Sequence, residues 1–186
     1  MGGMLGALVG SFAPVAGSFE SIATATGNGG TTITFSSIPQ TYKHLQIRYN
    51  ARANSGAAIL GAVEMTFNSV GGTSYAFHRL WGNGSDPVAS NSVDQASIQN
   101  LTIAGGAVAS NVYGVGIIDI QDYSATTRNK TVRTLIGMDQ NSGNTSAQIL
   151  MLSGLFNSTS AITRIDLTLA AGFNSSTVYS LYGIKG

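Results

Sequence analysis

Residues 43–52 read KHLQIRYNAR, and every second side chain in this run is apolar. A period of two is the pattern of a β-strand, whose successive side chains point to opposite faces. The apolar face carries Leu45, Ile47, Tyr49 and Ala51, and the polar face carries His44, Gln46, Arg48, Asn50 and Arg52. We therefore predict a strand with one face in the core and the other in water or against a partner.

Strand patterns recur on both sides of this run, from Phe19 onward. Clusters of Gly, Asn, Ser and Pro separate them, and no stretch has a 3.6-residue period long enough for a stable helix, although a short helical turn fits around 90–95. The other predicted strands are 31–35, 62–68, 75–81, 97–103, 112–120, 131–138, 148–156, 162–169 and 177–184. This spacing predicts an all-β fold, an antiparallel β-sandwich or jelly roll of about eight to ten strands.

The composition is unusual in its low charge. Only 9% of the 186 residues are charged, against about 25% in an ordinary soluble domain. The formal net charge of +1 gives no basic field for nucleic acid, and the absence of Cys excludes a disulfide framework and thiolate metal sites. A surface built from Ser, Thr, Asn and Gly suits a protein covered by copies of itself or by neighbours in an assembly.

Residues 1–19, MGGMLGALVGSFAPVAGSF, contain no charged side chain. A signal peptide needs a basic start, and a membrane span needs about 20 strongly apolar residues without this many glycines. A flexible leader, a signal or membrane segment and an apolar arm remain open. We favour an arm at 1–19 that orders by packing on another subunit, followed by one β-sandwich domain at 20–186.

Residues with catalytic or metal-binding chemistry are few. His44 and His78 lie in strand patterns without an HxH or HxxxH spacing, so we interpret them as hydrogen-bonded strand residues. Asp119 and Asp122 are the closest pair of carboxylates to a glycosidase arrangement, but Asp122 also suits the cap of a turn. The sequence contains neither a GxSxG elbow nor a P-loop. We expect no enzyme activity and no cofactor or metal.

Arginines and aromatic residues supply the remaining candidates. Arg128, Lys130 and Arg133 form a small basic cluster, to which Arg48, Arg52 and Arg79 add if their strands are neighbours. Such side chains bind an acidic glycan, pair with carboxylates of a partner subunit or are simply solvated. Trp81 and Tyr123 are candidates for stacking on sugar rings, with the core as the alternative place for them.

Three stretches together resemble a group of small β-rich virion proteins of tailed phages that infect aquatic bacteria, including cyanophages. They are ITFSSIPQTYKHLQIRYNAR (33–52), YAFHRLWGNGS (75–85) with IIDIQDYSATTRNKTVRTLIG (117–137), and AITRIDLTL…YSLYGIKG (161–186). The resemblance covers residues 19–186. It implies a capsid decoration (cement) protein or a subunit of the tail or fibre, and it implies no catalytic residues.

The working hypothesis is therefore a phage virion protein, assembled in the bacterial cytoplasm, that reinforces the head. Its expected partners are copies of itself, for which a closed trimer is a natural arrangement, and the major capsid protein or other virion proteins, not nucleic acid or membrane. The expected anchors are Leu5, Leu8, Val9 and Phe12, with Arg48, Arg52, Arg128 and Arg133 as polar contacts. The alternative is a tail-fibre or baseplate module that binds host glycan through Trp81 and Tyr123.

Overall fold

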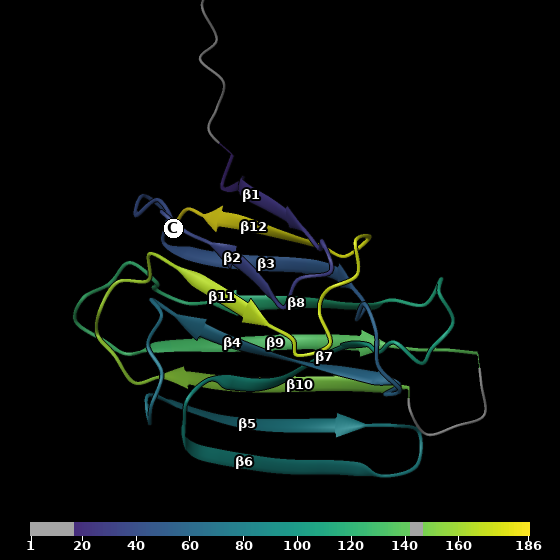
Figure 1. Ribbon diagram of the computed structural model, residues 1–186. Coiled ribbons are helices and arrows are strands. Elements are labelled where there is room, and N and C mark those ends of the chain that lie inside the picture. Colours follow the sequence, from purple (N-terminus) through teal and green to yellow (C-terminus); the bar gives the residue numbers. More distant parts are fainter. Residues whose placement is uncertain (1–16, 142–146) are drawn as a thin grey trace, which may run out of the picture.

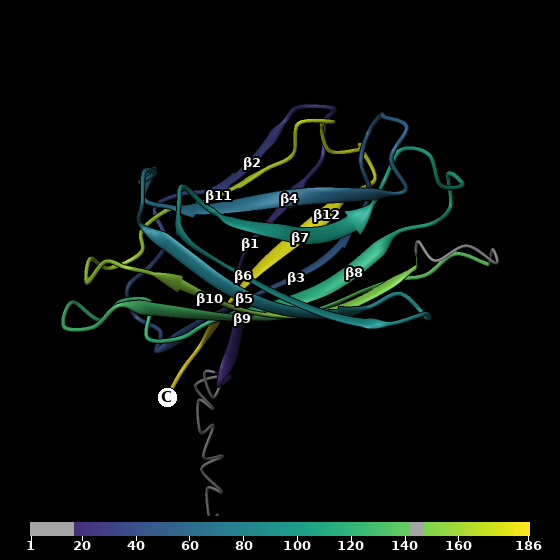
Figure 2. The ribbon, with the colours of Figure 1, turned by 90° about the horizontal axis from the view of Figure 1, so that it is seen from below.

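The computed structural model describes residues 17–141 and 147–186, which form twelve strands and no helix. The strands make two antiparallel sheets that pack face to face as a β-sandwich (Figure 1 and Figure 2). The strands are β1 (Phe19–Thr26), β2 (Thr32–Phe35), β3 (His44–Ala51), β4 (Leu60–Phe67), β5 (Tyr75–Gly82), β6 (Pro87–Gln95), β7 (Ile98–Ala104), β8 (Gly114–Ile120), β9 (Lys130–Met138), β10 (Gln148–Phe156), β11 (Ile165–Thr168) and β12 (Val178–Ile184). The all-β prediction is confirmed.

The order of the strands is that of a jelly roll with two added hairpins. One sheet has the order β1-β12-β3-β8-β9-β10-β5-β6, and the other has the order β2-β11-β4-β7. Without β5, β6, β9 and β10, the remaining eight strands form two four-stranded sheets with the orders β1-β12-β3-β8 and β2-β11-β4-β7, which is the arrangement of two Greek keys. The hairpin β5–β6 and the hairpin β9–β10 then widen only one of the two sheets.

This widening gives the two sheets very different sizes. The four-stranded sheet packs over the inner face of the larger one, while β5 and β6 project beyond it at one side (Figure 1). The opposite, outer face of the eight-stranded sheet has no layer of the described chain against it (Figure 2).

The core lies between the inner faces, where the alternation in the sequence predicts it. Leu45, Ile47, Tyr49 and Ala51 of β3 are all buried, as predicted. An aromatic cluster lies in the core where β10 pairs with β5. In this cluster the ring of Phe156 lies 5.4 Å from that of Phe67 and 5.1 Å from that of Tyr75. The apolar face of the 43–52 stretch therefore packs in the core between the two sheets.

All ten predicted strands are present, with ends shifted by a few residues, and two more were missed. The missed strands, β1 and β6, are the two edges of the eight-stranded sheet. The short helical turn considered around 90–95 is wrong, because these residues belong to β6 and pair with β5. No residue of β6 is buried, so no apolar alternation marks this strand in the sequence.

Phe19, the last residue of the expected arm, is the first residue of β1. The expected anchors Leu5, Leu8, Val9 and Phe12 lie outside the described residues. Within 17–141 and 147–186, the structure contains no helix that is long and apolar enough to cross a membrane.

Candidate interaction face

The outer face of the eight-stranded sheet carries a group of large apolar side chains. The strand register aligns four of them in one row, because Ile117 is opposite Leu135, Leu135 is opposite Met151, and Met151 is opposite Leu80. The next row along the strands adds Val115 and Ile149, which both lie opposite Gly137. We call these six residues on β8, β9, β10 and β5 the apolar patch: Leu80, Val115, Ile117, Leu135, Ile149 and Met151.

The apolar patch is open to solvent in this chain. Its members are between 38% and 61% exposed, and Ile149 is the most exposed of the six. Single exposed apolar residues are normal, but a contiguous group with a polar border is typical of an interaction site. The patch is therefore the candidate functional site.

Two glycines make the surface of the patch uneven. Ile149 lies between Gly137 on β9 and Gly82 on β5, and a β-carbon added at either glycine would meet no atom within 4 Å. Hollows of about 590 and 250 Å³ adjoin Ile149, and the lining of both includes Gly82. Ile149 thus stands as a ridge between two depressions that apolar side chains from a partner can fill.

A polar row borders the patch on one side. Asp119, Arg133, Ser153, His78 and Asn91 follow one another across β8, β9, β10, β5 and β6. Within this row Arg133 forms an ion pair with Asp119 at 3.2 Å, and Gln46 on β3 donates a hydrogen bond to Asp119 at 2.7 Å. The apolar patch therefore ends at this polar row on one side.

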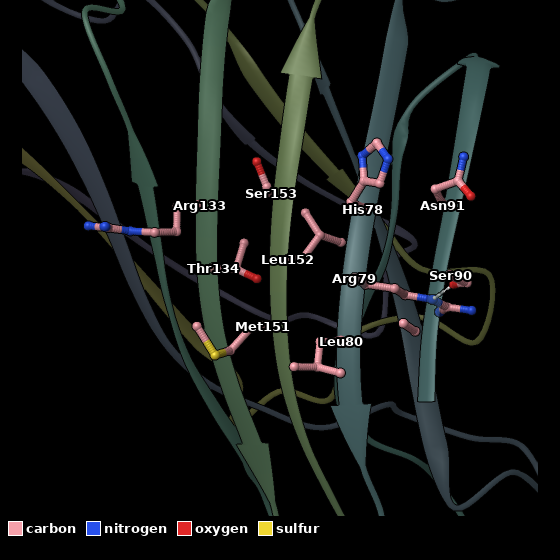
Figure 3. Close-up of a pocket in the computed structure, with 11 residues that line it drawn as sticks. His78, Arg79, Leu80, Ser90, Asn91, Arg133, Thr134, Met151, Leu152 and Ser153 are labelled. Carbon is pink, nitrogen blue, oxygen red and sulfur yellow. Dashed lines mark hydrogen bonds between the residues drawn. The ribbon is translucent and has the colours of Figure 1, made fainter. Parts of the chain in front are cut away.

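A trough of about 500 Å³ runs between this polar row and the patch. Figure 3 shows His78, Asn91, Arg133 and Ser153 along one side, with Leu80 and Met151 along the other. Residues of the row between them, including Thr134 and Leu152, complete the lining. The surface of the outer face is therefore both apolar and uneven.

The corner of the outer face next to β1 is aromatic. The ring of Phe19 stacks on that of Tyr182 at 4.8 Å, and the guanidinium of Arg48 lies 4.9 Å from the centre of the Phe19 ring. Arg48 is opposite Ile117, so this corner continues directly into the patch. The first described strand thus begins on the same face as the patch.

The structure separates the four arginines predicted as polar contacts. Arg48 and Arg133 lie on the outer face, beside the patch. Arg52 is only 7% exposed, and its guanidinium donates hydrogen bonds to the carbonyl oxygens of Ala109, Val112 and Val108. Arg52 therefore holds the loop between β7 and β8 and does not share a surface with the other three.

Arg128 lies apart from the patch, at a cluster of charges around Asp122. Its guanidinium pairs with the Asp122 carboxylate at 2.9 Å, and Lys43 approaches the other carboxylate oxygen at 3.1 Å. The ammonium of Lys43, with the charge of Arg128, lowers the pKa of Asp122 below its ordinary value against the effect of burial. The backbone N–H of Asp122 donates to Nδ1 of His44 at 3.0 Å. This cluster fixes the turn after β8.

The two aromatic residues predicted as sugar contacts also separate. Tyr123 is fully buried, and its hydroxyl donates a hydrogen bond to the carbonyl oxygen of Pro39. Trp81 is partly exposed, with the guanidinium of Arg79 4.3 Å from its ring centre. Trp81 lines a hollow of about 550 Å³ together with Asn83 and Gln148. Of these two described residues, Trp81 is accessible to a ligand and Tyr123 is not.

Sequence reasoning missed the apolar patch, although a signal for it exists. Residues 149–152 read Ile-Leu-Met-Leu, a continuous apolar run in an antiparallel strand of which only Leu150 and Leu152 are buried. An antiparallel strand with one solvated face normally alternates between apolar and polar residues, so an unbroken apolar run indicates that a partner covers the second face as well.

The part of the chain that the structure describes contains no group of three or more His, Cys, Asp or Glu residues that could hold a metal ion.

Comparisons with known proteins give no match to this chain among family models, curated proteins or solved structures. The apolar patch and its borders are therefore the basis on which a function is inferred.

Proposed function

We propose that this chain is a non-enzymatic structural protein of a phage virion, a capsid decoration (cement) protein that reinforces the head by bridging neighbouring subunits. The single observation that carries the assembly role is the apolar patch on the outer face of the eight-stranded sheet. The six side chains of the patch are at least 38% exposed, and four of them form one unbroken row across β8, β9, β10 and β5.

Covering this face stabilises an assembly through the hydrophobic effect. Burial of apolar surface contributes about 25 cal/mol per Å², and a stable interface buries about 1,000 Å² or more in total. The patch lies on paired strands, so its backbone groups are already satisfied and a partner need only cover side chains. A rigid apolar sheet face is thus well suited to non-covalent assembly.

Three further points support the proposed place in a virion. A jelly roll is an architecture that viral capsid proteins share with lectins and cupins, so the fold is compatible with the role without establishing it. We name a virion among these uses because residues 33–52, 75–85, 117–137 and 161–186 are expected to resemble small phage virion proteins, an expectation that rests on the sequence alone. The low charge of 9% reduces repulsion between closely packed copies.

Immunogold labelling of intact virions, with an antibody raised against residues 17–186, tests this proposal. Gold particles spread over the head support a decoration protein, and capsids prepared without the protein should then lose DNA at lower temperature. Gold confined to the tail rejects decoration of the head, and virions without label reject a place in the particle altogether. Labelling after competition with the purified chain is the control for specificity.

A second candidate function, binding of host-surface glycan from the tail, is favoured by the hollow at Trp81. An aromatic ring with the amide side chains of Asn83 and Gln148 offers both stacking and hydrogen bonds to a sugar. Binding to a glycan array that Trp81→Ala abolishes, while the circular dichroism spectrum stays unchanged, supports this function. Equal binding by both proteins, or none, rejects it.

A further inference from the structure

The apolar patch needs an occupant, and the chain itself contains a segment of matching chemistry outside the described residues. Residues 1–16 carry no charge and include Leu5, Leu8, Val9 and Phe12. We propose that residues 1–16 of one copy lie on the apolar patch of a neighbouring copy. This inference rests on the assembly role proposed above, and it identifies the partner as a second copy of the same chain.

The two surfaces match in charge and in shape. None of the six residues of the patch is charged, so neither side leaves a charge to be desolvated without a partner. The depressions beside Ile149, above Gly82 and Gly137, offer space for side chains from an extended segment. Large apolar side chains among Gly and Ala, as in residues 1–16, suit a surface in which ridges and depressions alternate.

The described chain begins on the same face of the sheet as the patch. Phe19 stacks on Tyr182 and Arg48 on the outer face, and Arg48 is the cross-strand neighbour of Ile117 in the patch. An extended chain spans about 3.3 Å per residue, so the preceding residues, 1–16, reach roughly 50 Å from this point. Since neighbouring strands lie about 4.8 Å apart, that length exceeds the width of the whole patch.

The direction of β1 favours a neighbouring copy over the same copy. Phe19 is level with Ile184 and His44, whereas the patch is level with Arg48 and Asn50, further along β3. β1 and β3 run in the same direction because both are antiparallel to β12. The chain that precedes Phe19 therefore points away from the patch of its own copy, and a neighbour beyond this end of the sheet is reached without reversal.

An interface between the segment of one copy and the face of the next joins two different surfaces. Such heterologous contacts generate closed rings or open filaments, according to the rotation between copies. Each copy then contributes its segment to one neighbour and its apolar patch to another, and these contacts link the copies of the assembly.

The absence of Cys allows a direct test with single cysteines. One preparation carries Leu8→Cys and a second carries Met151→Cys, so a disulfide between the two is intermolecular by construction. Under mild oxidation of the mixed full-length proteins, we expect this heterodimer to form at least tenfold faster than with Val70→Cys, a control in the β4–β5 loop that is also exposed. Equal rates for the two acceptors contradict the proposal.

A second measurement separates this proposal from other occupants of the patch. We expect Leu5→Asp/Leu8→Asp and Leu135→Asp each to weaken self-association at least tenfold by mass photometry, with Val70→Asp unchanged within twofold. Loss with Leu135→Asp but not with Leu5→Asp/Leu8→Asp indicates face-to-face contact between copies and overturns the proposal. A monomeric wild-type chain, or rapid closure of a disulfide within one chain that carries both cysteines, overturns it as well. None of these readouts depends on a virion, so failure of the proposed function is recognised separately.

Discussion

The ring of Tyr49 lies directly over Gly116, its partner across β3 and β8. A β-carbon built at Gly116 would lie 2.5 Å from Cε1 and Oη of Tyr49, so any larger residue here would force the Tyr49 ring to shift. The Tyr49 hydroxyl donates a hydrogen bond to the carbonyl oxygen of Thr102 on β7, in the opposite sheet. One glycine thus allows a tyrosine to connect the two layers.

Gly116→Ala is therefore expected to destabilise the fold. The added methyl displaces the Tyr49 ring, which also stacks on Tyr179 at 4.9 Å, and such overpacking costs about 1–3 kcal/mol. Gly137→Ala is the matched control on the neighbouring strand, because its β-carbon meets nothing within 4 Å. Urea denaturation monitored by fluorescence gives both free energies of unfolding. Equal values for the two variants would show that the Tyr49 ring is not held in place.

The faces of β9 give a second, independent prediction. Leu135 is 51% exposed on the outer face and Ile136 is 2% exposed in the core. We expect Leu135→Ser to change the free energy of unfolding of the monomer by less than about 0.5 kcal/mol and Ile136→Ser to lower it by about 3 kcal/mol. The comparison is made by thermal and chemical denaturation at low protein concentration. A reversed order would mean that the register of β9 is shifted by one residue.

The sequence predicts the strands that bury at least one face, and it fails where a strand buries neither face. The alternation of Leu45, Ile47 and Tyr49 identifies β3 because one face of this strand packs in the core. β1 and β6 are the edges of the larger sheet, where the burial that creates alternation is weak, and neither was predicted as a strand. The insertion of two hairpins beside β8 depends on pairing between distant residues, which periodicity does not encode.

The candidate site shows the same limit in a different form. Arg48 and Arg52 are four residues apart, on the same face in the strand pattern, yet Arg48 is exposed and Arg52 is buried. The difference arises because β3 ends at Ala51 and the loop between β7 and β8 folds over Arg52. Contacts made by a loop distant in sequence decide which arginine remains at the surface.

Arg52 is consequently expected to contribute to stability. Its Nη1 donates to the carbonyl oxygens of Ala109 and Val112 at 2.6 and 3.2 Å, and Nη2 donates to Val108 at 3.3 Å. Arg52→Met leaves these acceptors without their charged donor and is expected to lower the free energy of unfolding by about 2–3 kcal/mol. Hydrogen exchange should also show faster exchange in residues 105–113.

Arg128→Met is the control for this substitution, because the Arg128 side chain is 61% exposed and forms a surface ion pair with Asp122. Pairs of this kind contribute about 1 kcal/mol or less. If Arg128→Met costs as much as Arg52→Met, the assignment of Arg52 to the support of the β7–β8 loop is wrong.

The pH dependence of stability is expected to involve Asp166 on β11. Burial alone raises the pKa of this carboxyl, but hydrogen bonds from Arg164 and Thr34, with the charge of Arg164, hold the pKa below its ordinary value of 3.8. Arg164 binds both carboxylate oxygens, at 2.7 and 2.8 Å, and the Thr34 hydroxyl donates at 2.6 Å. Because the pKa is lower in the folded state than in the unfolded state, the contribution of this carboxylate is fully present above pH 3.8 and is lost as the pH falls through the folded-state value.

Asp166→Asn should therefore cost most at neutral pH and progressively less in acid. We expect a loss of about 1.5–3 kcal/mol at pH 7, as for a hydrogen-bonded charged group, and a smaller loss at each step as the pH falls below 3.8. Urea denaturation at pH 7, 5, 4, 3 and 2.5 measures the difference, with Asp86→Asn in the exposed β5–β6 loop as the control. A difference that stays constant across this range would mean that the Asn substitution acts through packing and not through the charge of Asp166.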